Sequence, residues 1–253
     1  MYAPERQQEI LRRARAVGRV DVATLAGDLA VTSETVRRDL DALERQGLLR
    51  RVHGGALPVE RLRFEPGVAE RAATMAAEKE RIAKVALDYL PREGTILVDA
   101  GTTTARFAEQ LPDDRELTVV TNALPIALTL SARPRLTVLT VGGRVRGRTL
   151  ALVDRWALRS LGEIHVDVAF VAANGVSVGG GLTTPDLAEA TVKEAMVAAA
   201  DRVVLLADHT KVGVDKFCRF ADIGAVDVFV TDAGVDDETA AVFRDAGVDM
   251  VRA

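Results

Sequence analysis

Residues 75–253 alternate short apolar runs with longer stretches of helical periodicity, and this alternation limits the fold more than any other feature of the chain. A strand that is buried on both faces reads as a continuous apolar run, and two parallel strands are usually joined by a helix. The pattern therefore predicts an α/β domain with a mainly parallel sheet that is covered on both faces. The expected strands are 95–98, 117–121, 136–141, 166–172, 203–207 and 226–231, and the expected helices are 75–90, 104–111, 123–131, 155–161, 185–200 and 237–245.

The first 58 residues have a different pattern, with three helix-like segments followed by a hairpin-like segment. Residues 4–17 carry apolar side chains at helical spacing, and Thr32 can cap the third helix. Two helices joined by about three residues, the second with paired arginines, form the helix-turn-helix arrangement. Residues 48–57 contain the pair Gly54-Gly55, which permits a tight turn, so we expect a hairpin wing there.

Two domains and a linker follow from these patterns. Residues 59–74 mix Pro66 and Gly67 with charged residues and have no sustained periodicity, which indicates a linker. The expected organisation is a winged helix-turn-helix DNA-binding domain at 1–58, the linker at 59–74, and the α/β domain at 75–253.

Charge is divided unevenly along the chain. The 253 residues have a net charge of −4, but residues 1–64 carry twelve Arg against nine Asp and Glu, which leaves +3 there and −7 on the rest. A basic first domain on an acidic body suits a protein whose first domain alone meets a polyanion such as DNA. The single cysteine, Cys218, excludes an internal disulfide, and no apolar run is long enough for a membrane helix. We therefore expect a cytoplasmic protein with no membrane partner.

The polar face of the third helix and the wing contain the candidate DNA-binding residues. Arginine forks read guanine edges, and hydroxyl groups reach phosphates or bases. Asp39 would repel phosphate, so we expect it to orient a neighbouring arginine or to bond within the domain. A basic helix that docks onto another protein is the alternative interpretation. The candidates are Thr32, Ser33, Thr35, Arg37, Arg38, Arg50, Arg51 and His53.

An ordered set of residues in this region resembles the signature of the DeoR family of bacterial repressors. It comprises Thr32 to Leu40 (TSETVRRDL), Leu43-Glu44, Gly47-Leu48 and Arg51 to Ala56 (RVHGGA). The resemblance covers the whole chain and implies a sugar-phosphate-sensing domain similar in fold to ribose-5-phosphate isomerase. It also implies a repressor of a sugar-utilisation operon that a phosphorylated sugar releases from its operator. Residues 1–8 and 207–213 look closest to actinobacterial fructose-operon repressors, which implies fructose 1-phosphate as the effector.

The segment Asp99 to Thr104 (DAGTTT) ends an expected strand and opens an expected helix. Glycine lets the backbone approach a ligand, and a helix N-terminus favours an anion, so the segment predicts a phosphate site. An ordinary turn with threonine caps is the alternative. Polar residues at other strand ends converge on the same crevice in such sheets, and the resemblance implies effector binding by this segment and by Lys193. The candidate effector-binding residues are Asp99, Gly101, Thr102, Thr103, Thr104, Thr121, Asn122, Gly142, Gly143, Asn174, Gly175, Lys193, Asp208 and Lys211.

Two places depart from the pattern of the family. The chain has Leu152-Val153-Asp154 where members commonly have a glycine, and His209-Thr210 where members tend to have two serines. Either departure is a candidate cause of a changed effector preference.

A sugar-phosphate isomerase with a DNA-binding appendage is the alternative function, and a module whose first domain binds protein is a third. Isomerisation needs a carboxylate or histidine beside a carbonyl, and Asp99, Asp186 and His209 are the candidates near strand ends. No spacing marks a base with its orienting partner, and the sequence has no P-loop, Cys/His metal cluster or serine elbow. We therefore expect no catalytic residue, metal or cofactor. We expect a homo-oligomer, a dimer or tetramer, that binds double-stranded operator DNA and a phosphorylated sugar.

Overall fold

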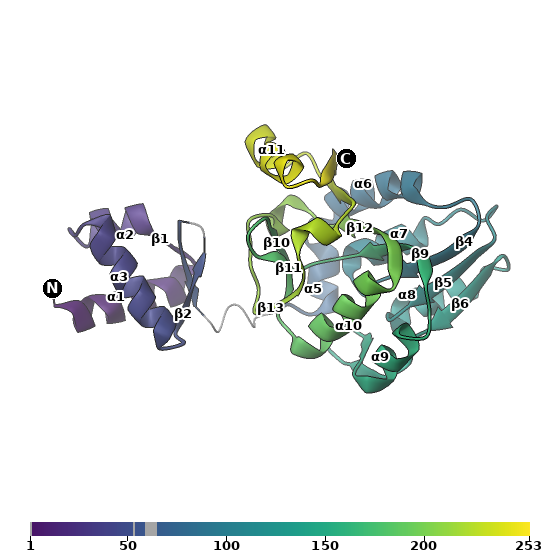
Figure 1. The fold of residues 1–253 in the computed structure, drawn as a ribbon, viewed down its shortest axis with the longest axis horizontal. Coiled ribbons are helices and arrows are strands. Elements are labelled where there is room, and N and C mark those ends of the chain that lie inside the picture. Colours follow the sequence, from purple (N-terminus) through teal and green to yellow (C-terminus); the bar gives the residue numbers. More distant parts are fainter. Residues whose placement is uncertain (1, 53, 59–64) are drawn as a thin grey trace. The chain divides into compact units, whose positions relative to one another are not determined.

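The chain folds into two compact units, and the computed structural model describes residues 2–52, 54–58 and 65–253 of it (Figure 1). The first unit, residues 1–64, we call the head, and the second, residues 65–253, we call the body. Each unit has its own buried apolar core.

In the described residues of the head, 2–52 and 54–58, there are three helices and a small antiparallel sheet with the strand order β1-β3-β2. Asp21 accepts a hydrogen bond from the backbone N–H of Ala23 at 2.9 Å, and Thr32 accepts one from that of Thr35 at 3.2 Å. Each cap satisfies a free N–H group where the second or third helix begins. The predicted helix-turn-helix and hairpin wing are both confirmed. The elements are α1 (Ala3–Val17), β1 (Val20–Asp21), α2 (Val22–Asp28), α3 (Ser33–Arg45), β2 (Leu49–Val52) and β3 (Gly55–Pro58).

One face of α3 is fixed in the core of the head. Val36 and Leu40 of α3 and Ile10 of α1 are fully buried. Burial of such a side chain contributes about 1.5–3 kcal/mol, so this face anchors α3 and leaves the opposite face toward solvent. The two-residue strand β1 was not predicted. It approaches the wing so closely that a Cβ at Gly55 would collide with the backbone oxygen of Val20.

A seven-stranded parallel sheet forms the centre of the body, in the order β15-β14-β12-β9-β4-β5-β6. It contains all six predicted strands, and the seventh, β15, is a short edge strand whose DMVR sequence has no apolar run. The strands are β4 (Gly94–Val98), β5 (Leu117–Thr121), β6 (Leu136–Thr140), β9 (Val166–Val171), β12 (Ala200–Leu206), β14 (Val228–Thr231) and β15 (Asp249–Arg252).

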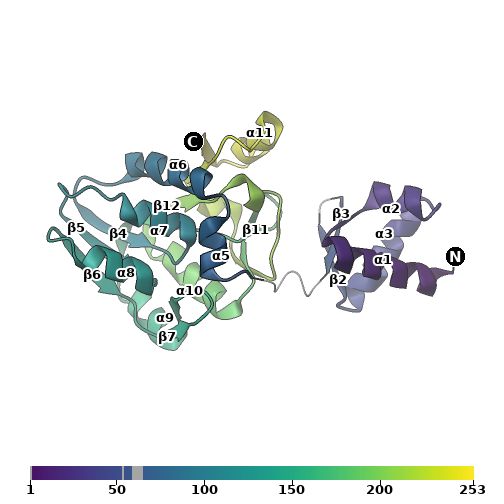
Figure 2. The same ribbon diagram turned by 180° about the vertical axis from the view of Figure 1, so that it is seen from behind.

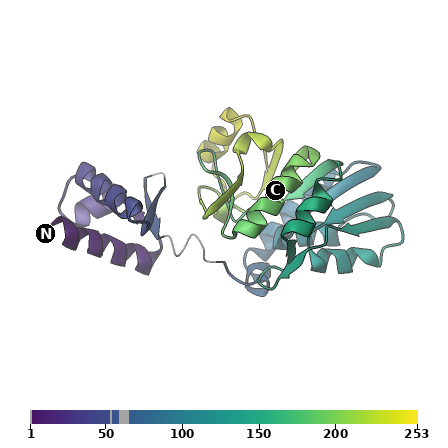
Figure 3. The ribbon, with the colours of Figure 1, turned by 60° about the horizontal axis from the view of Figure 1, so that its bottom comes forward.

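Helices cover both faces of this sheet (Figures 2 and 3). On one face α6, α7 and α8 bury residues such as Phe107, which stacks on Phe170 of β9 with ring centroids 4.2 Å apart. On the other face α9 and α10 bury Leu161 and Met196. The predicted α/β class is therefore confirmed. The helices are α6 (Ala76–Ala86), η1 (Leu87–Tyr89), α7 (Thr102–Glu109), α8 (Leu124–Ser131), α9 (Arg155–Leu161), α10 (Leu187–Ala198) and α11 (Asp237–Asp245).

Several small elements of the body were not predicted. They are only three or four residues long, which is too short for a periodic signal, and one of the strand pairs joins distant parts of the chain. They are the hairpin of β7 (Arg144–Arg146) and β8 (Ala151–Val153), the sheet of β10 (Gly175–Ser177), β11 (Gly181–Thr184) and β13 (Cys218–Ala221), and the 3-10 turns η2 (His209–Lys211) and η3 (Ile223–Ala225).

The predicted linker of residues 59–74 differs from the structure at its second half. Residues 65–74 belong to the body and include the helix α5 (Val68–Ala73). Lys79 of α6 donates hydrogen bonds to the carbonyl oxygens of Arg71 and Thr74, which fixes the end of α5. A six-residue helix is too short to give a periodic signal. Residues 59–64 lie outside the described residues.

Candidate functional site

The outward face of α3 carries two exposed arginines. The side chains of Arg37 and Arg38 are 57% and 79% exposed, whereas the neighbouring Val36 is fully buried. Glu34 lies 3.8 Å from Arg37 and 3.5 Å from Arg38, and ion pairs this exposed contribute about 1 kcal/mol or less. Both guanidinium groups can therefore turn from Glu34 to a phosphate or a base edge at little cost.

Other candidates of the head have varied surroundings. The hydroxyl of Thr32 lies 2.9 Å from that of Thr35 and caps α3, so both threonines serve the start of the helix. Ser33 is partly exposed beside them, and Arg50 of β2 is exposed. His53 lies outside the described residues. DNA contact by any of these residues stays a prediction.

Arg51 fastens the wing to α3. Its guanidinium donates to the carboxylate of Asp41 at 2.5 Å and to the carbonyl oxygen of Arg37 at 3.2 Å, and its backbone N–H donates to Glu44 at 2.8 Å. The basic sequence of the wing predicts Arg51 as a DNA contact, and this contact stays a prediction. The structure gives it a bracing role between wing and helix, with 27% of its side chain exposed.

Asp39 lies on the buried face of α3 and bonds within the head, as we expect from the sequence. Its Oδ2 accepts from Nε of Arg6 at 2.5 Å, and its Oδ1 accepts from Nε2 of Gln7 at 3.1 Å. These bonds join α3 to α1. Their charge-assisted character makes them stronger than neutral hydrogen bonds.

We expect Asp39→Ala to destabilise the protein by about 1–3 kcal/mol, because partly buried donors on α1 lose this acceptor. The measurement is urea unfolding of the full chain. Asp28→Ala is the control, since Asp28 is half exposed and forms a surface ion pair with Arg13. Equal destabilisation by the two variants would contradict the assignment.

The carboxyl ends of β4, β5, β9 and β12 meet at one edge of the body sheet, as parallel strands require. Asn122 after β5 accepts a hydrogen bond from the backbone N–H of Ala100 at 2.7 Å, and Thr121 donates to the carbonyl oxygen of Val98 at 2.6 Å. Both side chains are at most 1% exposed. Thr121 and Asn122 therefore hold the backbone on both sides of Asp99, at Val98 and Ala100.

Asp99 and Lys193 form a buried pair at the centre of this edge. The ammonium group of Lys193, on α10, donates to Oδ2 of Asp99 and, at 2.9 Å, to the carbonyl oxygen of Ala172. The backbone N–H of Ala172 also donates to Oδ2 at 3.0 Å. The other oxygen, Oδ1, is buried and has no hydrogen-bond partner. Lys193 thus orients Asp99 and leaves one acceptor for a further donor.

A pocket opens at the N-terminus of α7, and its lining includes Ala100, which follows Asp99 in the chain, but neither Asp99 nor Lys193. It encloses about 530 Å³ of empty space, its open mouth included, and Gly101, Thr102, Arg71, Arg106 and Thr149 are among its lining residues. A Cβ at Gly101 would lie 2.9 Å from Oγ1 of Thr104 and 3.0 Å from Cβ of Ala172, so only glycine fits without a shift.

The three threonines of the DAGTTT segment are not equivalent. Thr102 lines the pocket, whereas Thr103 and Thr104 are buried. The hydroxyl of Thr104 donates to the carbonyl oxygen of Asp99 at 2.6 Å, which stabilises the turn. Thr104 therefore has an internal role in the turn, and α7 has no side-chain cap. A phosphate site at Thr102 stays a prediction.

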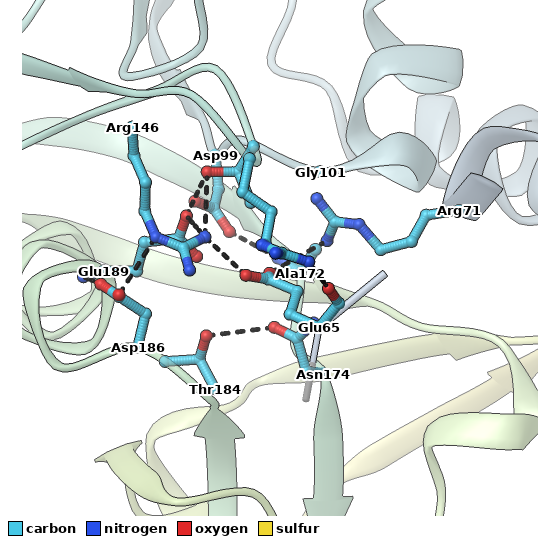
Figure 4. A network of polar contacts seen from close by, with 12 residues as sticks. Glu65, Arg71, Asp99, Gly101, Arg146, Ala172, Asn174, Thr184, Asp186 and Glu189 are labelled. Carbon is cyan, nitrogen blue, oxygen red and sulfur yellow. Dashed lines mark hydrogen bonds and ion pairs between the residues drawn. The ribbon is translucent and has the colours of Figure 1, made fainter. Parts of the chain in front are cut away.

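A network of buried charges lies next to the pocket and was not predicted (Figure 4). Arg146 of β7 lies 2.5 Å from the carboxylate of Glu65 and 3.1 Å from those of both Asp186 and Glu189. Burial raises the pKa of Glu189 despite the opposing charge of Lys193. These residues come from three separate segments, residue 65, β7 and the start of α10, so no local pattern predicts them.

The remaining effector candidates lie in loops or in the short elements β10 and η2. Gly143 has a positive φ of 111°, and a Cβ there would collide with the carbonyl oxygen of Val153. Asn174 accepts from the hydroxyl of Thr184 at 3.1 Å. None of the remaining candidates is among the described residues that line the pocket. This group comprises Gly142, Gly143, Asn174, Gly175, Asp208 and Lys211.

The two departures from the family pattern are each paired within the body. Asp154 has a φ of 77° and lies 2.6 Å from Arg144. Nδ1 of His209 lies 2.7 Å from Asp232. Burial raises the pKa of Asp232, but hydrogen bonds from the backbone N–H groups of His209 and Gly234 outweigh it and leave that pKa below its usual value.

Comparison with known families decides the relationship. The model of the DeoR-like helix-turn-helix domain matches residues 6–61, and the model of the DeoR C-terminal sensor domain matches residues 74–233. The chain belongs to the DeoR family. It is a DNA-binding transcriptional regulator, and the resemblance seen in the sequence is confirmed.

DeoR-family relatives align along almost the whole chain. The HTH-type transcriptional regulator GlpR of Haloferax volcanii is 36% identical, over 99% of this chain and 98% of the relative. The uncharacterized regulator FruR of Bacillus subtilis is 34% identical over 92% of each chain. The glycerol-3-phosphate regulon repressor of Escherichia coli is 31% identical, also over 92% of each. All three names describe regulators rather than enzymes.

Among solved structures, the DeoR-family chain is similar to ribose 5-phosphate isomerase A of Methanocaldococcus jannaschii, with 18% identity, a TM-score of 0.42 and 55% of each chain covered. It is also similar to the sorbitol operon regulator SorC of Klebsiella pneumoniae, with 12% identity, a TM-score of 0.39, and 76% and 85% covered. Likenesses of this size carry no argument about activity. Within the part of the chain that the structure describes, no helix combines the length and apolar character needed to cross a bilayer.

Proposed function

We propose that this DeoR-family regulator represses a sugar-utilisation operon and leaves its operator when a phosphorylated sugar binds the pocket at Gly101 and Thr102. The observation that supports the proposal most is the composition of that pocket. It combines a helix N-terminus with the guanidinium-bearing residues Arg71 and Arg106, beside the buried, half-satisfied carboxylate of Asp99.

Each part of the pocket suits one part of such a ligand. A helix N-terminus and arginine side chains favour a phosphate group, and arginine can bind it through two parallel hydrogen bonds. Oδ1 of Asp99 is an acceptor without a donor, and a buried group in that state is stabilised by a hydroxyl of the ligand. A phosphorylated polyol or sugar carries both groups.

Fructose 1-phosphate is our first candidate for the effector. It is supported by the resemblance to fructose-operon repressors, and glycerol 3-phosphate is the comparison ligand because of the name of the Escherichia coli relative. We propose the cytoplasm as the location, where operator DNA and sugar phosphates are both accessible.

A homo-oligomer, a dimer or tetramer, would place two heads on two operator half-sites in successive major grooves. Effector binding would favour an arrangement of heads with lower DNA affinity, which is population shift rather than chemistry. A coupling in the usual range weakens DNA binding by about 5–150-fold.

The first test is thermal unfolding of the full chain with fructose 1-phosphate, glycerol 3-phosphate and ribose 5-phosphate. A ligand at about 100 times its dissociation constant adds about 2.7 kcal/mol of stability. The same compounds serve in an isomerase assay, in which we expect no turnover. Turnover at an ordinary enzymatic rate would favour the isomerase alternative instead.

Thr102→Ala should weaken phosphosugar binding about tenfold or more, because a hydrogen bond to a charged group contributes about 1.5–3 kcal/mol. Operator binding should stay as in the wild type, so the variant should need more effector for release. The measurement is calorimetric titration alongside DNA titration. Thr129→Ala is the control, since Thr129 is exposed on α8 and its hydroxyl only donates to the carbonyl oxygen of Pro125. Equal affinities in the two variants would remove Thr102 from the site.

A further inference from the structure

Glu65 is a buried carboxylate at the first residue of the body. Its side chain is 1% exposed, its Oε2 lies 2.5 Å from Arg146, and Arg148 donates to its backbone carbonyl oxygen. In the sequence it directly follows the last residue of the head. The carboxylate thus anchors the start of the body at the edge of the effector pocket.

The pairing of Glu65 with Arg71 is incomplete on both sides. Oε1 of Glu65 lies 3.7 Å from Arg71, too far for a hydrogen bond, and is buried without another partner. Nε of Arg71 is likewise buried without a partner. Buried polar atoms in this state cost free energy that a better-placed partner recovers.

Arg71 faces the pocket as well as Glu65. It lines the pocket together with Gly101 and Thr102, and Figure 4 shows its side chain reaching from α5 toward Gly101 and Glu65. An anion seated at Gly101 can therefore use the same guanidinium group that Glu65 uses.

We propose that Glu65 is an internal competitor of the effector's phosphate for Arg71, and that this competition couples phosphate binding to the anchoring of the first residue of the body. The inference rests on the proposed function. A phosphate on Arg71 withdraws one of the two cations that hold Glu65, which loosens the anchor at residue 65. Because linkage is reciprocal, an unseated Glu65 makes the pocket bind phosphate more tightly.

The test compares full-length wild type with Glu65→Gln. We expect Glu65→Gln to bind fructose 1-phosphate about fivefold tighter or more, as a coupling in the usual range requires. Its affinity for a DNA duplex selected from a random pool should already be reduced without effector, and effector should change that affinity less than twofold. Inorganic phosphate, as a second probe, should also bind tighter if the phosphate alone drives the competition.

Glu70→Gln is the matched control. Glu70 is exposed on the same helix α5, so the variant makes the same change of charge without touching the anchor. It should behave as wild type toward both ligands. If Glu70→Gln reproduces the Glu65→Gln results, general electrostatics rather than competition is responsible, and the proposal is overturned.

A double-mutant cycle with Arg71→Gln separates competition from a structural effect. In that background Glu65→Gln should no longer raise phosphosugar affinity, because the contested cation is gone. An undiminished gain would overturn the proposal, as would a wild-type effector response in a folded Glu65→Gln protein. Failure of the wild type to bind any phosphosugar or DNA would instead refute the proposed function itself.

Discussion

Replacing Arg37 and Arg38 together with alanine should weaken operator binding by about 10²–10⁴-fold while phosphosugar binding is unchanged. Each good arginine contact to a base contributes about 1–3 kcal/mol of discrimination. Both side chains are more than half exposed on α3, so both can reach DNA. Val36 and Leu40 keep the opposite face of α3 in the core, so the surface change should not unfold the head.

The dependence on salt gives a second readout of the same variant. A protein that loses two phosphate contacts loses about 1.8 units of slope in log affinity against log salt concentration. A change in slope would assign the arginines to phosphates, whereas a loss of sequence preference at constant slope would assign them to base edges. Fluorescence anisotropy with a selected duplex and with a random duplex measures both.

Arg12→Ala is the control for loss of positive charge from the head. Arg12 lies on α1 and not on α3, its side chain is 68% exposed, and it forms an ion pair with Glu9. It should cost less than about threefold in affinity, in keeping with an exposed charge away from the contact surface. If Arg37→Ala/Arg38→Ala lowers affinity no more than Arg12→Ala does, α3 is not the recognition helix.

The sequence predicted those elements whose apolar pattern is local. β4, β5 and β9 are buried on both faces of the sheet, so each reads as an apolar run, and α3 carries its core residues at helical spacing. By contrast β11 has the sequence GLTT, and its partner β13 lies more than thirty residues away. Such a strand exists because of tertiary pairing, which periodicity does not contain.

The same distinction divides the candidate site. The DAGTTT segment could be predicted because a strand end and a helix start are adjacent there. Lys193 was predicted from the resemblance, because it is 94 residues from Asp99 in the sequence and no local pattern joins the two. In the Arg146 network, Arg146 is 81 residues from Glu65 and 43 residues from Glu189, so no local pattern contains it. Arg71 was not predicted as a pocket residue, because its six-residue helix gives no periodic signal.

Lys193→Met should destabilise the body by about 3–5 kcal/mol, the usual cost of removing one partner from a buried ion pair. Asp99 is fully buried, and without Lys193 its Oδ2 keeps only the backbone N–H of Ala172. For a unit of this size the loss corresponds to a fall in the unfolding temperature of roughly 6–20 °C. Calorimetry of the full chain measures it.

The double variant Asp99→Asn/Lys193→Met decides whether charge is the cause. With no carboxylate left to bury, it should recover most of the lost stability, since replacing both members of a buried pair is often close to neutral. It should nevertheless bind phosphosugar poorly, because the oriented carboxylate is gone. If the double variant is as unstable as Lys193→Met, the ion pair does not hold this edge of the sheet together, and the contact of the Lys193 ammonium group with the Phe220 ring, 5.5 Å from its centroid, is the alternative cause.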